Sequence, residues 1–452
     1  MESKRSSFTG KIGFVLAAAG SAVGLGNIWR FPYLAAKYGG GMFLLVYIAL
    51  SLTFGFSLMV AEVAIGRKTK LSAISAYGSL DKRFSFVGIL CSLVPVIILP
   101  YYSVIGGWVM KYMFGFMAGK TAEMAADGYF GNYIGLVGQP VFWFLLFIGL
   151  TALVVMIGVE RGVEKISKIM MPILIVLILF IVGYTLVTMD GAWDGVIYYI
   201  KPDFSKFSIM TVVAAMGQLF YSMSLAMGIM ITFGSYMKKD IAIENATKQI
   251  EFFDTGVAFL AGLMIIPAVF AFSGGNEEAL GQGPGLMFVT LPKIFETMPG
   301  GSFIGAAFFI MVLFAALTSS ISLMETVVSI FMDKLKLGRK AAIFVTLAVS
   351  LVLGLLSSLG YSAWADVKLL GMQFLDFFDF LSNSLLMPIV ALVTSIFVGF
   401  VLKPKAIIDE VEISEKFNSK RLFTVVIRYV APVCILIILG SSILSAFGIV
   451  SI

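Results

Sequence analysis

Long apolar stretches alternate with short polar junctions along the whole chain. A helix that spans a bilayer needs about 20 mostly apolar residues, and eleven stretches of this sequence meet that requirement. They cover residues 12–35, 43–65, 86–114, 141–159, 169–187, 209–236, 252–272, 303–331, 341–359, 380–402 and 425–447. Because no junction is long enough for a soluble domain, we predict an all-α integral membrane protein in which residues 1–452 form a single transmembrane domain.

Two of these stretches contain residues that weaken a helix. The first holds Gly20, Gly24, Gly26 and Asn27 close together, and the sixth holds two hydroxyls and a glycine within residues 218–228. Glycine costs about 1 kcal/mol in a helix interior, and non-helical backbone inside a membrane occurs only where it lines a cavity. Small residues can also serve close helix packing. Since the breaks lie five spans apart, we favour two inverted repeats with a binding site between them.

Composition favours a transporter or a channel over an enzyme. The chain is 60% hydrophobic and only 13% charged, with a mean hydropathy of +1.01. Histidine is absent, which removes the commonest general base and metal ligand. The two cysteines, Cys91 and Cys434, both lie in apolar stretches and suggest no disulfide. We therefore expect neither catalysis nor an organic cofactor.

The basic residues predict how the chain is oriented. The net charge is +6, and Lys and Arg gather at alternate junctions, as at Lys4 and Arg5 and again at Arg67 and Lys68. This is the positive-inside pattern of membrane proteins. It predicts a cytoplasmic N-terminus and, after eleven spans, an extracellular C-terminus in the inner (plasma) membrane. The same distribution argues against a nucleic-acid partner.

Asp254 is a carboxylate within the seventh apolar stretch. A charge at the bilayer centre costs about 2.5–3.5 kcal/mol on insertion scales, and such residues usually mark an ion or proton path. The alternative is a residue near the cytoplasmic interface, since Glu244, Lys248 and Glu251 are only a turn or two away. Carboxylate, hydroxyl, amide and carbonyl oxygens are hard ligands that suit sodium, and the interrupted stretches supply all four.

The first interrupted stretch carries the string GSAVGLGNIWRFPY at residues 20–33. This string resembles the first-helix signature of the neurotransmitter:sodium symporters. The resemblance runs from residue 4 to about 447 and is reinforced by motifs at 39–41, 101–108, 217–218 and 317–320. It implies the LeuT-type fold, in which helices 1 and 6 are broken at mid-membrane. The first five-helix repeat would cover about 11–187, the second about 207–402, and an extra helix 11 about 423–449.

The resemblance implies two sodium sites. The first would use the Ala22 carbonyl and the side chains of Asn27, Ser222 and Asp254; the second would use the carbonyls of Gly20, Val23 and Ala315 and the hydroxyls of Thr318 and Ser319. Many members of the family have asparagine at the position of Asp254, and chloride-dependent members place a chloride beside the first sodium. Because an aspartate could supply that negative charge itself, we expect chloride independence.

The resemblance also implies an α-amino acid as substrate. Its carboxylate would meet the backbone amides around Leu25 and Gly26 and the Tyr102 hydroxyl. Gly24 stands where monoamine carriers have an aspartate, which favours a substrate that brings its own carboxylate. The other substrate-binding residues would be Ser21, Ala22, Ile98, Tyr221, Ser222, Ser224, Met227, Ser319 and Leu323. Since the wall around the side chain is mostly apolar, we expect a neutral, hydrophobic amino acid, aliphatic or aromatic.

Two charge pairs resemble the gates of the family. Arg30 and Asp379 would form the extracellular latch, with Tyr221 as a lid over the substrate. Arg5 and Asp333, supported by Phe8 and Tyr236, would form the cytoplasmic latch. Ordinary interfacial ion pairs are the alternative, and exposed pairs contribute only about 0–1 kcal/mol.

Gly162 and Pro172 match a further motif of the family, a hinge at the start of helix 5. Proline removes a backbone donor and loosens the preceding helical turn. A plain helix kink is the alternative interpretation of this pair.

These observations predict a sodium-coupled symporter that takes up an amino acid by alternating access, with two sodium ions. An ion channel and a non-transporting amino-acid sensor of the same fold are the alternatives. A ring-forming filter sequence is not evident, which counts against a channel. The twelfth helix of many relatives is missing, so dimer contacts inferred from them do not carry over. We expect a monomer or a weak dimer in the lipid bilayer.

Overall fold

The computed structural model describes residues 7–275 and 285–446, with side chains up to Leu444. Nine helices in this part of the chain are long and apolar enough to cross a membrane. In chain order they are α3–η2–α4 (Gly41–Leu50, Ser51–Gly55, Phe56–Thr69), α6 (Ser85–Met117), α9 (Gly138–Ile157), η4–α10 (Val159–Glu164, Lys165–Thr188), α14 (Ile243–Ser273), α16 (Gly301–Leu335), α17 (Arg339–Leu359), α18–η8–α19–η9 (Phe374–Asp379, Phe380–Leu386, Met387–Ile396, Phe397–Val401) and α21–η10–α22 (Lys420–Val425, Val426–Val430, Ala431–Ala446). The segments η2, η4, η8, η9 and η10 are π-helical turns within these spans.

The first and sixth predicted spans are both broken. The first consists of α1 (Lys11–Ala22) and of η1 and α2 (Gly26–Arg30, Phe31–Lys37), which are bent by 54° with respect to α1. The sixth consists of α12 (Ile209–Ser222) and α13 (Ile229–Tyr236), with residues 223–228 in turns between them. Neither α12 nor α13 is long enough to cross a membrane alone. Taken as one crossing each, the two broken spans complete the predicted set of eleven.

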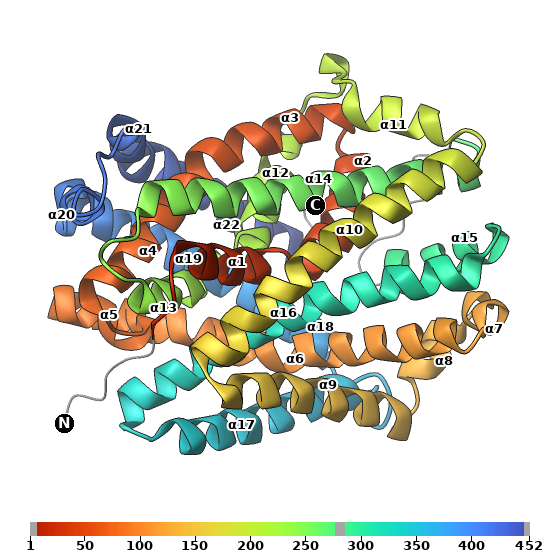
Figure 1. Ribbon diagram of the computed structural model, residues 1–452, viewed down its shortest axis with the longest axis horizontal. Coiled ribbons are helices and arrows are strands. Elements are labelled where there is room, and N and C mark those ends of the chain that lie inside the picture. The colour runs from red at the N-terminus through yellow and green to blue at the C-terminus, as the bar shows by residue number, and fades with distance from the viewer. Residues whose placement is uncertain (1–6, 276–284, 447–452) are drawn as a thin grey trace.

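The spans run side by side along one axis, with short helices at both ends (Figure 1). One end carries α5 (Ala73–Leu80), α20 (Pro404–Val411) and the described N-terminus, and the other carries α7 (Thr121–Ala125), α8 (Tyr129–Ile134), α11 (Ala192–Ile200) and α15 (Leu291–Thr297). Hydropathy does not predict these short helices, because each is too short to cross a membrane. The smaller turns η3, η5 and η7 cover Lys82–Phe84, Phe204–Lys206 and Leu286–Thr290.

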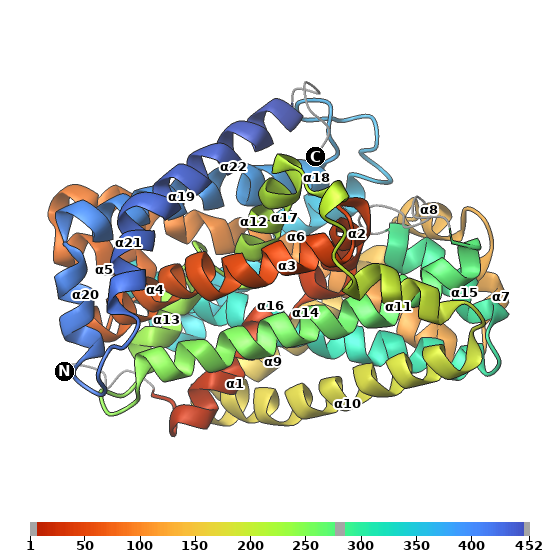
Figure 2. The same cartoon turned by 90° about the horizontal axis from the view of Figure 1, so that it is seen from above.

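The broken spans lie in the interior of the bundle. Helix α1 contacts α10, α14 and α16, while α12 packs against α3 and α22, and α13 packs against α4. The continuous spans differ in how deeply they are buried. In Gly301–Leu335, 83% of the most apolar window is buried, against 33% in Lys420–Leu444. Helix α22 accordingly lies at the edge of the bundle, beside α19 (Figure 2).

Some span boundaries differ from the predicted ones. The fifth span begins at Val159 rather than near residue 169, and the seventh begins at Ile243 rather than near residue 252. Both added segments are rich in charged residues and extend the helix on the N-terminal side of the apolar stretch. Hydropathy detects the part of a helix that suits hydrocarbon, and it misses helical turns outside that layer.

Candidate substrate and ion site

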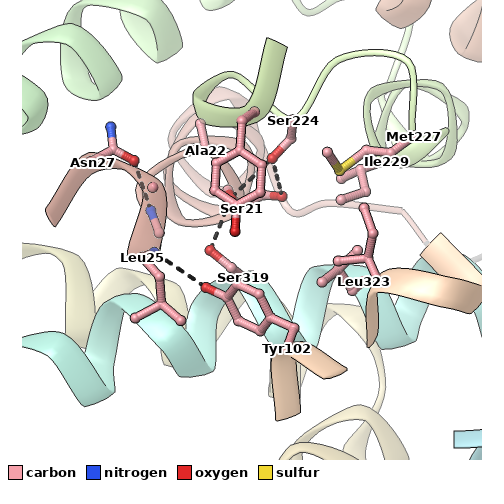
Figure 3. A pocket seen from close by; sticks show the side chains of 14 residues that line it. Ser21, Ala22, Leu25, Asn27, Tyr102, Ser224, Met227, Ile229, Ser319 and Leu323 are labelled. Carbon is pink, nitrogen blue, oxygen red and sulfur yellow. Dashed lines mark hydrogen bonds between the residues drawn. The ribbon is translucent and has the colours of Figure 1, made fainter. Parts of the chain in front are cut away.

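A small cavity of about 30 Å³ lies where the two broken spans meet. It is lined by backbone and side chains from four spans (Figure 3): Ser21, Ala22, Gly24, Leu25, Gly26, Asn27, Ile98, Tyr102, Tyr221, Ser224, Met227, Ile229, Ser319 and Leu323. Eleven of the twelve predicted substrate-binding residues are in this set. The exception is Ser222, whose hydroxyl faces a polar cluster beside the cavity. Ile229 was not predicted, because it lies beyond the break and reads as an ordinary apolar helix residue.

The first break turns backbone amides toward the cavity. The Gly24 N–H donates to Asn27 Oδ1 at 3.1 Å, and the Leu25 N–H reaches the Tyr102 hydroxyl at 3.4 Å. The latter is a long and weak hydrogen bond. Backbone donors at the start of a helical segment favour an anionic group. This side of the cavity can therefore hold a carboxylate.

The second break is held by partners from distant parts of the chain. The Ala226 N–H donates to Glu62 Oε1 on α4 at 2.7 Å, and the Ser224 hydroxyl donates to the Ser21 carbonyl at 3.0 Å. Glu62 is 1% exposed and was not singled out from the sequence. The rule that drew attention to Asp254, a carboxylate within an apolar span, also applies to Glu62.

The rest of the cavity wall is apolar. Met227, Ile229 and Leu323 gather on the side away from Asn27 (Figure 3), and Ile98 also lines the cavity. Tyr221 lies against the first break so closely that a Cβ on Gly26 would overlap its ring. The cavity thus has one polar and one apolar side, with an aromatic ring packed onto the backbone between the two spans.

A buried polar cluster lies next to the polar side of the cavity. Asp254 is fully buried and is surrounded by three side chains from three other spans. Its carboxylate accepts hydrogen bonds from Asn27 Nδ2 at 2.8 Å, from the Ser222 hydroxyl at 2.8 Å and from the Tyr47 hydroxyl at 3.4 Å. The hydrogen bond to Asn27 places the Asp254 carboxylate beside the break in the first span. Tyr47 was not predicted, because nothing in its local sequence marks it.

A second group of oxygens lies on the other side of the first break. The Ser319 hydroxyl donates to the Ser21 carbonyl at 3.0 Å and is 3.4 Å from the Gly20 carbonyl and 3.3 Å from the Val23 carbonyl. Thr318 donates to the Ala315 carbonyl at 3.1 Å within its own helix. The structure thus brings together the five residues predicted for a second sodium site.

The predicted outer gate residues line one cavity of about 460 Å³ beyond Tyr221. Arg30 stacks on the Tyr221 ring, with its guanidinium carbon 5.5 Å from the ring centroid. Asp379 accepts hydrogen bonds from Tyr101 at 3.2 Å and from Asn383 at 2.6 Å. The structure has Arg30 and Asp379 on the same cavity without an ion pair between them.

The predicted inner gate is described in part, since Arg5 lies outside the described residues. Asp333 accepts hydrogen bonds from the backbone and the hydroxyl of Ser72, at 2.7 and 2.6 Å. The Phe8 ring packs edge-on against Tyr236, whose hydroxyl donates to Glu325 at 2.8 Å. These residues lie at the end of the bundle that carries the described N-terminus.

The predicted hinge residues both lie in the first half of the fifth span. Gly162 lies in the π-helical turn η4, where a Cβ would overlap the Val154 carbonyl, and Pro172 lies inside α10. A π-helical turn inserted before a helix is often found at functional positions. The geometry is compatible with a hinge and equally with a fixed kink.

Two broken spans that enclose a buried, half-polar site define a membrane transporter of the LeuT-type fold rather than an enzyme. The family model described as the sodium:neurotransmitter symporter family matches residues 5–127 and 129–449. The chain belongs to this family, and it is a multi-pass, sodium-dependent membrane transporter. The predictions of family, fold class and a non-enzymatic role are confirmed.

Individual relatives are similar over nearly the whole chain. The sodium-dependent transporter YhdH of Bacillus subtilis is 34% identical over 97% of this chain and 97% of its own. A sodium-dependent transporter of Haemophilus influenzae is 32% identical over 97% of this chain and 98% of its own. The solved structure of MhsT in complex with L-phenylalanine is 36% identical, with a TM-score of 0.87, and covers 97% of this chain and 100% of the MhsT chain.

Proposed function

We propose that the chain is a symporter that couples sodium entry to the uptake of a neutral, hydrophobic α-amino acid. The observation that carries this proposal is the two-sided cavity between the broken spans. The Leu25 amide and the Tyr102 hydroxyl suit a carboxylate, while Ile98, Met227 and Leu323 suit an apolar side chain. The phenylalanine complex of the related transporter MhsT supports the same substrate class.

The two oxygen clusters are the candidates for two sodium sites, and both adjoin the cavity. In the first, the oxygens of Asp254 and Ser222 lie within 2.8 Å of each other. Asn27 turns its amide nitrogen toward them and its oxygen toward Gly24. Because sodium takes oxygen ligands, its binding here requires the Asn27 side chain to rotate. In the second, the Gly20 and Val23 carbonyls already point at Ser319.

We also propose chloride independence, which the position of Asp254 supports. As a fully buried carboxylate within the first cluster, Asp254 would provide the negative charge that a chloride would otherwise bring. We expect uptake to continue when chloride is replaced by gluconate. Uptake that collapses under this replacement would contradict the assignment of that role to Asp254.

Alternating access would use the two gates and the hinge. Arg30 and Asp379 line the outer cavity, and Tyr221 lies between that cavity and the substrate cavity, as a lid would. Gly162 and Pro172 would let helix 5 loosen and admit water to the second sodium site. The end of the bundle that carries α5 and α20 also carries basic residues such as Arg67 and Lys68. We propose that this end faces the cytoplasm of a cell with the protein in its plasma membrane.

The experiment that tests the substrate class is competition by each of the twenty amino acids for sodium-dependent binding to the purified protein. We expect aliphatic and aromatic neutral amino acids to compete best. A preference for lysine or glutamate would overturn the proposal. Asp254→Ala and Thr318→Ala test the ion clusters, and each is expected to weaken the dependence on sodium. Unchanged sodium dependence in both variants would overturn the ion assignment.

A further inference from the structure

The outer cavity contains a cation and a carboxylate that do not meet. Arg30 and Asp379 both line this cavity, yet they form no ion pair of the kind that joins Arg67 to Glu410 at 2.9 Å. The Arg30 guanidinium instead lies over the Tyr221 ring. Its donors make no hydrogen bond to another residue in the described part of the chain. An arginine side chain with five unused donors has the capacity to bind elsewhere when the cavity closes.

Asp379 is held in place by a residue one turn further along the same span. Asn383, in the π-helical turn η8, donates from Nδ2 to Asp379 Oδ1 at 2.6 Å and to the Tyr101 hydroxyl at 3.1 Å. Tyr101 donates to the same carboxylate oxygen at 3.2 Å. Both hydrogens of the Asn383 amide are thereby used. Asp379 Oδ2 accepts no hydrogen bond from any described residue, so it is available to a further donor.

The amide oxygen of Asn383 is buried and has no hydrogen-bond partner among the described residues. Such an acceptor is costly when it has no donor, because it has lost its water without a replacement. Arg30 is the only Lys or Arg among the described residues that line the outer cavity. Its planar guanidinium offers paired donors that can bind two neighbouring acceptors at once. Asp379 Oδ2 and Asn383 Oδ1 are two such acceptors on side chains one turn apart.

We propose that Asn383 is the third member of the outer latch. When the cavity closes, Arg30 donates to Asp379 Oδ2 and to Asn383 Oδ1 together, while the Asn383 amide nitrogen keeps Asp379 in position. The inference rests on the outer gate of the proposed function. It assigns Asn383 a positioning and closing role in which it does not touch the transported amino acid.

A labelling experiment tests this role without any knowledge of the substrate. Gly217 lines the same cavity and has open space around the position of a Cβ, so Gly217→Cys provides a reporter. Cys434→Ser is added so that Cys434 does not react with the label, and Cys91 is kept because it is buried. In proteoliposomes, the rate of reaction with a membrane-impermeant maleimide reports how open the outer cavity is. The labelling rate is measured with and without sodium. The variants are then compared with the parent in whichever of the two conditions gives the parent the slower labelling.

Asn383→Leu removes the acceptor and both donors, and we expect it to raise the labelling rate about tenfold. Asn383→Asp keeps an acceptor for Arg30 but loses the donors that hold Asp379, so its labelling rate should lie between those of the parent and Asn383→Leu. Ser441→Ala is the matched control, since Ser441 lines the cavity but does not contact the latch. It should stay within about twofold of the parent. In an Arg30→Met background, Asn383→Leu should add less than about twofold.

Three results would overturn the inference. The first is that Asn383→Leu labels at the parent's rate. The second is that Asn383→Asp labels as fast as Asn383→Leu, which would mean that Asn383 acts only by holding Asp379. The effect of Asn383→Leu could also persist in full without Arg30. If the parent neither binds nor accumulates an amino acid, the proposed function fails, while the labelling rates still decide the role of Asn383.

Discussion

The breaks in the two broken spans line the same cavity but are stabilised in different ways. In the first, only residues 23–25 separate α1 from η1. Two of its hydrogen bonds are local: the Gly24 N–H donates to Asn27 Oδ1 at 3.1 Å, and the Asn27 N–H donates to the Gly24 carbonyl at 3.2 Å. Its Leu25 N–H and Val23 carbonyl have distant partners in Tyr102, at 3.4 Å, and Ser319, at 3.3 Å. In the second, residues 223–228 separate the helices, and Ala226 bonds to Glu62, which is 164 positions away.

Backbone conformation shows the same contrast. Within the second break, Ser224 and Ala226 have positive φ angles of 53° and 60°, which non-glycine residues rarely adopt, whereas Gly228 at 74° is unstrained. The first break contains no positive φ angle. A strained segment persists only where its surroundings fix it. The first break thus needs no strained backbone and makes part of its hydrogen bonds within its own glycine and asparagine, whereas the second depends on the assembled bundle to hold its strained residues.

The largest effect is expected from filling the first break. Gly26→Ala places a methyl group where the Tyr221 ring lies. Overpacking costs about 1–3 kcal/mol, so we expect sodium-dependent uptake to fall by about 100-fold. Gly217→Ala is the matched control, because no other side chain or distant backbone atom lies within 4 Å of the point that its methyl group would occupy. Near-normal uptake by Gly26→Ala would show that the close contact with Tyr221 is dispensable.

A smaller effect is expected when the distant partner of the second break is removed. Glu62→Ala leaves the Ala226 N–H buried without an acceptor, which costs about 1–3 kcal/mol. We expect amino-acid affinity to fall about tenfold in equilibrium binding. Glu62→Gln keeps an oxygen for the same bond and should stay within about twofold of the parent. If the two variants were equally weak, the negative charge of Glu62 would matter rather than its hydrogen bond.

The smallest effect is expected from relieving the strain in the second break. The left-handed conformation costs alanine about 1–2 kcal/mol, and the higher unfolded-state entropy of glycine offsets about half of that gain. Ala226→Gly should therefore keep its uptake and raise the thermal unfolding temperature slightly. Ala215→Gly, inside α12, should lower that temperature. Equal destabilisation by both substitutions would mean that the bundle does not strain Ala226.

Much of the architecture could be predicted because hydrocarbon imposes a length and a polarity on each span. The breaks were predictable for a related reason, since glycines and polar side chains gather at two places that lie five spans apart. Tyr47 and Ile229 could not be found in this way. Each becomes a site residue only when another span packs against it, and its own sequence neighbours are ordinary apolar residues. Ser222 was assigned to both the substrate cavity and the first sodium site; its hydroxyl bonds to Asn27 and Asp254 in the ion cluster, and it does not line the cavity.

The resemblance of residues 20–33 to a family signature supplied what the apolar pattern could not, namely the roles of single side chains. It brought together Gly20, Val23 and Ser319, which the structure places within hydrogen-bond distance. It did not predict that Arg30 stands apart from Asp379, because a sequence signature carries no conformational state. The repeat boundaries near residues 187 and 207 stay predictions.

The central claim is that the cavity between the two broken spans carries an amino acid across the membrane at the expense of a sodium gradient. The direct measurement is the time course of uptake, into proteoliposomes, of the amino acid that binds most tightly in the competition panel. With an inward sodium gradient, the internal concentration should rise above the external one and fall back once the gradient is dissipated. Equilibration without accumulation would indicate a channel, and binding without entry would indicate a sensor; either result would contradict sodium-coupled symport.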